Sequence, residues 1–134
     1  MSGYVASHFC LYGDFDTRDI TAALSIDPSS TIEKGELLDI AGEAVPSRIA
    51  DWSLYGPDEM SVNEQLDYLV STLWGRADAV KGLTTQHKGD IVVTFARSAG
   101  SNTMTLKPDV LNKLADLNIT LTCDSIEDEV EDGD

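Results

Sequence analysis

The stretch SVNEQLDYLVSTLWGRADAV, residues 61–80, decides what the rest of the chain must pack around. Ser61 followed three residues later by Glu64 is the capping-box pattern that begins a helix. Apolar residues then recur with the spacing of one helix face, at Val62, Leu66, Leu69, Val70, Leu73, Trp74, Ala77 and Val80. This stripe predicts one long amphipathic helix packed on a core, with Gly82 and then Lys88–Gly89 ending the helical region.

Strands are expected on both sides of this helix. HFCLYGD (8–14) alternates between apolar and polar residues and ends at a Gly-Asp turn, and ITLTC (119–123) alternates throughout. IVVTFAR (91–97) is almost continuously apolar, which is typical of a strand covered on both faces. Two further candidate strands, 31–40 and 48–55, are joined by a connection that contains Gly and Pro.

Two shorter helices complete the pattern. Asp16 is placed to cap the first, with Asp19 at the capping-box position, and this helix must stop before Pro28. Pro108 suits the first turn of the second. The apolar positions are Ile20, Ala23 and Leu24 in the first helix and Leu111, Leu114, Ala115 and Leu117 in the second.

The expected order of elements is therefore β-α-β-β-α-β-α-β. Its first six elements have the order of ferredoxin-like folds, and an α-β pair follows them. We expect an α+β protein with one mostly antiparallel sheet and helices packed on one side. A length of 134 residues fits one domain, which we place at residues 1–123, followed by an acidic, flexible tail at residues 124–134.

The charge of the chain is strongly negative, with 24 acids against 9 bases and a net charge of −15. Seven of the acids lie in the last eleven residues, which leaves 17 acids and 9 bases in the rest. Such a field repels nucleic acid and anionic lipid and attracts cationic partners. We therefore expect no nucleic-acid or membrane partner. Acidity that serves only solubility is the alternative explanation.

The sequence gives few signs of a special compartment. We find no apolar run near the roughly 18 residues of a membrane span, and the start MSGYVASHF lacks the basic and apolar parts of a secretory signal. Cys10 and Cys123 lie near opposite ends on strand-like segments. A disulfide would form only if those strands were neighbours, and free buried thiols in a cytoplasmic protein are the expectation.

Motifs for catalysis are missing from the sequence, which has no nucleophile elbow, phosphate-binding loop, zinc-protease motif or paired C-x-x-C. His8 and Cys10 would share one face of the first strand, but two soft ligands do not complete a zinc site. Asp14 and Asp16 fit a turn and a helix cap better than a cation site. We expect no enzyme activity, no cofactor and no metal.

The middle of the chain holds the candidate binding residues Lys34, Glu36, Arg48 and Trp52. If strands 31–40 and 48–55 form a regular hairpin, these four side chains could share one surface. Lys34 and Arg48 would then hold an anionic or polar ligand in a small pocket walled by Trp52. The other interpretation is that Gly35 makes a β-bulge, so that the two charges reach solvent and Trp52 caps the core under the long helix.

The chain resembles an uncharacterised family, the domain of unknown function 4279. The matching segments, in order, are GDFDTRDITAALSIDP (13–28), KGE (34–36), RIADW (48–52) and LKPDVLNKLADLNITL (106–121). The resemblance covers residues 8–123. The acidic tail departs from the family pattern, and so does CDSIEDE, which stands where an aromatic residue usually follows the last strand.

The resemblance implies a compact α+β fold in bacterial proteins without established catalytic residues. Some members look like small proteins encoded beside toxins, which suggests an immunity protein that neutralises a cognate, cationic toxin by direct stoichiometric binding. Tyr55, Asp58 and Glu59 follow Trp52 in an exposed-looking loop and could add contacts. The alternative function is a small-ligand binding or sensing module built on Lys34, Glu36, Arg48 and Trp52. The sequence does not indicate the oligomeric state.

Overall fold

The computed structural model describes residues 5–96 and 103–126. Its main sheet has five strands in the spatial order β2-β5-β1-β6-β7. All neighbouring strands are antiparallel except β6 and β7, which run parallel. The bounds are β1 Val5–Gly13, β2 Ser30–Ile32, β5 Ala50–Tyr55, β6 Lys88–Ala96 and β7 Thr120–Ile126.

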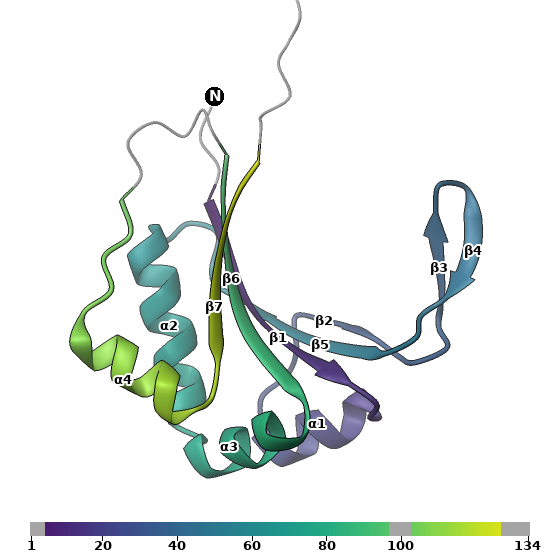
Figure 1. Cartoon of the computed structure of the whole chain (residues 1–134), viewed down its shortest axis with the longest axis horizontal. Helices are drawn as coiled ribbons and strands as arrows, with labels where there is room; N and C mark the ends of the chain where they lie inside the picture. Colours follow the sequence, from purple (N-terminus) through teal and green to yellow (C-terminus); the bar gives the residue numbers. More distant parts are fainter. Residues whose placement is uncertain (1–4, 97–102, 127–134) are drawn as a thin grey trace, which may run out of the picture.

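Four helices lie on one side of this sheet (Figure 1). They are α1 Thr17–Leu24, α2 Val62–Trp74, α3 Ala77–Gln86 and α4 Pro108–Asp116. The core fills the space between them and the sheet, with Phe9 and Leu11 from β1 meeting Leu66, Leu69 and Leu73 from α2. The predicted mixed α+β domain, with a mostly antiparallel sheet and helices on one side, is confirmed.

The predicted helix starts are confirmed by their caps. Asp16 accepts a hydrogen bond from the Arg18 amide at 2.9 Å, and Ser61 and Glu64 form the reciprocal capping box. Pro108 occupies the first turn of α4, where a missing amide hydrogen costs nothing.

The prediction of one continuous helix through residues 61–80 is wrong. α2 ends at Trp74, and Gly75 with Arg76 separates it from α3. The Arg76 amide bonds to the Leu73 carbonyl at 2.9 Å, a tightened last turn, and Arg76 itself leaves the helical region. The apolar stripe crosses this break because both helices bury their apolar faces in one core, so periodicity alone does not reveal it.

The prediction of one strand through residues 31–40 is also wrong, and Gly35 does not make a bulge. A turn over residues 33–36, with Gly35 at a φ of 89°, separates β2 from a new strand, β3 Leu37–Ile40. β3 pairs only with β4, Glu43–Pro46, as a separate two-stranded sheet that projects away from the rest of the fold (Figure 1). The strand predicted at 48–55 begins at Ala50.

The end of the chain differs slightly from expectation. β7 continues to Ile126, so the first three residues of the predicted tail are strand, and the rest of that tail lies outside the described residues. Both cysteines are free, but only Cys10 is buried. They lie on β1 and β7, which β6 separates. Among the described residues, no helix is long and apolar enough to cross a membrane.

Candidate functional site

The face of the sheet that points away from the helices is the candidate site. Because side chains alternate along a strand, the residues between the core positions of β1 and β5 point to this second face. They are His8, Cys10 and Tyr12 on β1 and Asp51, Ser53 and Tyr55 on β5. No described element packs over them (Figure 1). We call this surface the open face.

One row of short polar side chains crosses the open face. Ser30 lies opposite Ser53, Ser53 lies opposite Cys10, and Cys10 lies opposite Asp90. A cleft of about 590 Å³ lies over β2, β5 and β1. It is lined by Ala6, Ser7, His8, Cys10, Tyr12, Ser30, Ile32, Asp51, Ser53, Tyr55, Gly56 and Asp58. Its lining is therefore hydroxyl, thiol, imidazole and carboxylate groups more than apolar ones.

Hydrogen bonds order the floor of this cleft. Ser53 Oγ donates to Asp51 Oδ1 at 2.8 Å and lies 3.5 Å from Cys10 Sγ. At the rim, the hydroxyl oxygens of Ser30 and Tyr55 are 2.8 Å apart. The rings of His8 and Tyr55 meet in a T-shaped arrangement, with 5.9 Å between the ring centroids.

The neighbouring part of the open face carries a second carboxylate, Asp90. It lies on β6, accepts a hydrogen bond from Thr122 Oγ1 on β7 at 3.0 Å and is buried, whereas Asp51 is half-buried. Asp90 and Asp51 thus place two carboxylates beside Cys10, on the strands that flank β1. A positively charged or hydrogen-bond-donating group would be stabilised there.

The Cys10 thiol and the Tyr12 hydroxyl, near the centre of the face, both have a pKa raised above the ordinary value. Burial raises the pKa of the Cys10 thiol, and the carboxylates of Asp51 and Asp90 act in the same direction, while hydrogen bonds with Ser53 and Tyr12 oppose them. Burial also raises the pKa of Tyr12, as does its hydrogen bond with Cys10. A thiol that keeps its proton is a poor nucleophile.

The pocket expected around Trp52 does not form. Trp52 is 0 % exposed, and its ring packs in the core on the helix side of the sheet, edge-on to Phe9. The indole Nε1 donates to Thr21 Oγ1 on α1 at 3.0 Å. Of the two interpretations of this region, the structure agrees with the one in which Trp52 belongs to the core and Lys34 and Glu36 reach solvent. The alternative pocket shared by Trp52, Lys34 and Arg48 does not form, because the helix-facing side of β5 is core.

Lys34 and Glu36 lie in the turn at the root of the β3–β4 hairpin. Lys34 Nζ pairs with Asp14 at 3.0 Å, and Glu36 Oε1 accepts a hydrogen bond from the Glu33 amide at 3.0 Å. Both side chains are exposed. Glu36 bonds within the turn, whereas Lys34 ties the turn to Asp14, just after β1. Arg48 is exposed in the segment between β4 and β5. These three residues do not contribute to the cleft.

Of the other three predicted residues, two lie at the cleft and one does not. Tyr55 and Asp58 line the cleft, and Glu59 is exposed beside it in sequence. The structure thus brings two of the seven predicted residues to the open face. Sequence reasoning did not propose Asp51, Ser53 and Asp90 there. The signal that could have found them was alternation, because they have the opposite parity to the core residues of their own strands.

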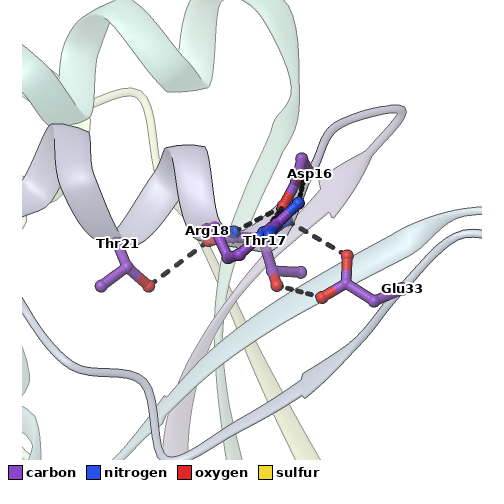
Figure 2. A network of polar contacts seen from close by, with 5 residues as sticks. All are labelled: Asp16, Thr17, Arg18, Thr21 and Glu33. Carbon is purple, nitrogen blue, oxygen red and sulfur yellow. Dashed lines mark hydrogen bonds and ion pairs between the residues drawn. The ribbon is translucent and has the colours of Figure 1, made fainter.

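A compact polar network fixes the first helix against the hairpin root (Figure 2). Glu33 accepts hydrogen bonds from the amide of Thr17, at 3.3 Å, and from its hydroxyl group. Arg18 is held at the same helix start by Asp16, with 2.8 Å between Nη2 and Oδ2. The contact between Thr17 and Glu33 joins segment 13–28 to the residue that precedes KGE at 34–36. Two of the segments that carry the family resemblance therefore meet in space.

Metal ligands are not gathered at this site. Within residues 5–96 and 103–126, no three His, Cys, Asp or Glu side chains are arranged to hold a metal ion. His8 and Cys10 share the open face, as alternation predicts, but Ser53 and Tyr12 are the side chains bonded to the thiol.

Comparison with known proteins places the chain in a family. No curated protein and no solved structure matches it. The model of a family described as a domain of unknown function, DUF4279, matches residues 3–126. This match covers nearly the whole chain and includes every described helix and strand. The chain belongs to the DUF4279 family.

Proposed function

We propose that this protein is a non-catalytic binding protein that neutralises a cationic partner protein by stoichiometric contact. The observation that carries the proposal is the open face, a sheet surface without helices on which Asp51, Asp58 and Asp90 provide carboxylates. A net charge of −15 adds a long-range attraction for a basic partner. Capture by electrostatic steering is fast, as an inhibitor requires.

The partner that fits this proposal best is a toxin encoded beside the protein, which makes the protein an immunity protein. The support is the resemblance of family members to proteins encoded next to toxins, together with the acidic surface. We place the protein in the cytoplasm, where an immunity protein meets its toxin and where free thiols such as Cys10 and Cys123 persist.

Calorimetric titration of the full chain with the product of the adjacent gene tests this function. We expect one-to-one binding with a submicromolar Kd, loss of the partner's activity, and weaker binding as salt rises. Asp51→Asn combined with Asp58→Asn should weaken binding. Glu59→Gln, which removes a charge from the same loop outside the cleft, is the matched control. Absence of binding to that product and to other basic proteins of the same organism would refute the function.

A second candidate function is the binding of a small polar or cationic metabolite in the cleft. The observation that favours it is the 590 Å³ volume above an ordered floor of buried hydroxyl and thiol groups. Thermal-shift measurements with polyamines, arginine and sugars test it, with Ser53→Ala as the variant that disrupts the floor. If no compound raises the Tm of the natural protein, this candidate fails.

We also propose that the fold is a ferredoxin-like core with additions. The support is the antiparallel order β2-β5-β1-β6, which matches that of a split βαβ unit when the β3–β4 hairpin is set aside. The hairpin, α3 and the α4–β7 pair are then additions. A solved structure of a family member, compared with known ferredoxin-like domains, would decide.

A further inference from the structure

The β3–β4 hairpin stands apart from the core yet is rich in apolar side chains. No core residue in the described chain comes from it. Eight large apolar side chains are exposed in the described chain, and four lie in the short segment from Leu37 to Ile49. These four are Leu37 at 66 %, Ile40 at 53 %, Ile49 at 44 % and Val45 at 37 %. Exposed apolar side chains gathered in this way mark an interaction site.

Both faces of the hairpin are apolar near the root and acidic near the tip. In the observed register Leu38 lies opposite Val45 and Ile40 opposite Glu43, so these four share one face. Leu37 lies opposite Pro46 and Asp39 opposite Ala44, and these share the other. Each face thus carries apolar groups and one carboxylate, and residues 35–47 contain no Lys or Arg. A hairpin resting on its own protein would need only one apolar face.

The root of the hairpin is held firmly. The Gly35 amide bonds to the Ser47 carbonyl and the Ser47 amide to the Glu36 carbonyl, both at 2.8 Å. Glu33 is fixed to the start of α1 by Thr17 (Figure 2). An isolated two-stranded hairpin is only marginally stable in water, and the two backbone bonds extend the pairing of its arms to the root. The contact of Glu33 with Thr17 and the ion pair of Lys34 with Asp14 tie that root to the rest of the fold and so set its direction. A defined direction lowers the entropy lost on binding.

We propose that this hairpin inserts into a cleft of the partner protein, with apolar cleft walls on both sides of the hairpin and basic residues at the deep end. The inference rests on the proposed function and names the contact element. Asp39 and Glu43 near the tip meet the basic residues, while Leu37, Ile40 and Val45 meet the apolar walls. A second copy of this chain is a poor occupant, because two chains of net charge −15 repel each other.

Photo-cross-linking of the full chain, expressed in the organism that encodes it, tests the insertion. The cross-linking residue benzoylphenylalanine replaces Leu37 on one hairpin face, Val45 on the other, Tyr55 on the open face, or Leu111 on α4, an exposed control position. We expect positions 37 and 45 to cross-link to the same foreign protein, at peptides that lie in one cleft and include Lys or Arg. Position 111 should give no such product.

The outcomes separate this inference from the proposed function. Cross-links from position 55 without any from 37 and 45 would overturn the insertion and leave the proposed function standing. Cross-links from only one hairpin face, to a second copy of this chain, or with equal yield from position 111 would also overturn the insertion. If none of the positions reaches a foreign protein, both proposals fail.

Binding measurements with the partner identified by cross-linking then show how much the hairpin side chains contribute to affinity. Leu37→Ser combined with Val45→Ser should raise the Kd roughly tenfold or more, because buried apolar anchors dominate interface energies. Leu111→Ser should leave the Kd unchanged. All three side chains are at least one-third exposed, so circular dichroism should show an unchanged fold. An unchanged Kd in the double variant would overturn the insertion.

Discussion

A line of hydrogen bonds runs from one buried indole to the root of the hairpin. Trp52 Nε1 donates to Thr21 Oγ1, and Thr21 Oγ1 donates to the Thr17 carbonyl at 3.3 Å. Thr17 in turn donates to Glu33 through its amide and hydroxyl groups. Thr17 is only 4 % exposed, so its hydroxyl group depends on Glu33 for a partner. Glu33 therefore carries a structural role at the residue scale.

Replacing Glu33 by Ala should lower the free energy of unfolding by about 1–3 kcal/mol, the usual cost of leaving a buried hydrogen-bonding group unpaired. Urea denaturation followed by circular dichroism measures this change. The matched control is Glu59→Ala, which removes an exposed carboxylate and should change the free energy by less than about 0.5 kcal/mol. Equal effects from the two variants would contradict the assigned role.

Asp16 gives a prediction on pH. Hydrogen bonds from the Arg18 side chain and then from its amide lower the pKa of Asp16 from its usual 3.8 to about 2. A carboxyl group with a lowered pKa in the folded state stabilises the fold above its unfolded pKa and loses that contribution as pH falls. Asp16→Ala should therefore reduce stability at neutral pH. The variant should also lose less stability than the natural protein as pH falls from 3.8 to about 2. Measuring the Tm of the natural protein and of the variant as pH falls checks this. Two Tm curves that fall by the same amount over this pH range would refute it.

Residue positions explain why the candidate site was only partly predictable. Parity placed Arg48 and Trp52 on one face of a strand, but Ala50 begins β5, so Arg48 lies outside the strand. The face that Trp52 occupies is core because four helices lie over it, and no local pattern states which side of a sheet the helices will take. Tyr55 and Asp58 were found because Tyr55 ends β5 and Asp58 lies in the loop that follows, so both reach the cleft from its rim.

At the scale of elements, the turn that joins β3 to β4 has the backbone conformation of a tight β-hairpin. Ala41 and Gly42 both have positive φ, 54° and 84°, as the two central residues of a type I′ turn require. An L-residue other than Asn or Asp costs roughly 1–2 kcal/mol in this conformation. The turn therefore contains strain that a better residue would remove.

Ala41→Asn should stabilise the hairpin, because Asn-Gly is the preferred pair for this turn. We expect the amides of residues 37–45 to exchange with solvent about five- to tenfold more slowly, which corresponds to roughly 1 kcal/mol. Hydrogen–deuterium exchange measures this directly. Gly42→Ala is the opposing control and should speed exchange in the same residues. Faster exchange in Ala41→Asn would refute the turn assignment.

Elements marked by local chemistry were predictable, and breaks between elements were not. The caps at Asp16 and Ser61 and the proline at 108 gave correct helix starts, because a cap depends on neighbours in sequence. The apolar stripe continued across Gly75, and the apolar parity of residues 32, 38 and 40 continued across Gly35. In both cases, long-range packing or pairing decides where one element ends.

At the scale of the whole molecule, the sheet has two unlike faces. One holds the core, and the other holds the cleft and the row of polar groups that includes Cys10. The two thiols can report on this organisation, because Cys10 is 2 % exposed with a raised pKa and Cys123 is exposed. Thiol reactivity follows exposure and the fraction of thiolate.

Ellman's reagent should therefore modify one thiol per native chain quickly at pH 8 and the second only after denaturant is added. Cys123→Ser should abolish the fast phase, whereas Cys10→Ser should retain it. Mass spectrometry of the labelled peptides assigns each phase. Fast labelling of both cysteines in the native protein would contradict the burial of Cys10.

The detachment of the hairpin from the core has an evolutionary consequence. Changes in its length or its apolar residues alter no core contact, so recognition can diverge while the fold keeps its stability. The root residues Glu33 and Lys34 are constrained by their contacts with Thr17 and Asp14, outside the hairpin. A family built this way could acquire new partners by varying about ten residues, with selection for folding acting elsewhere in the chain.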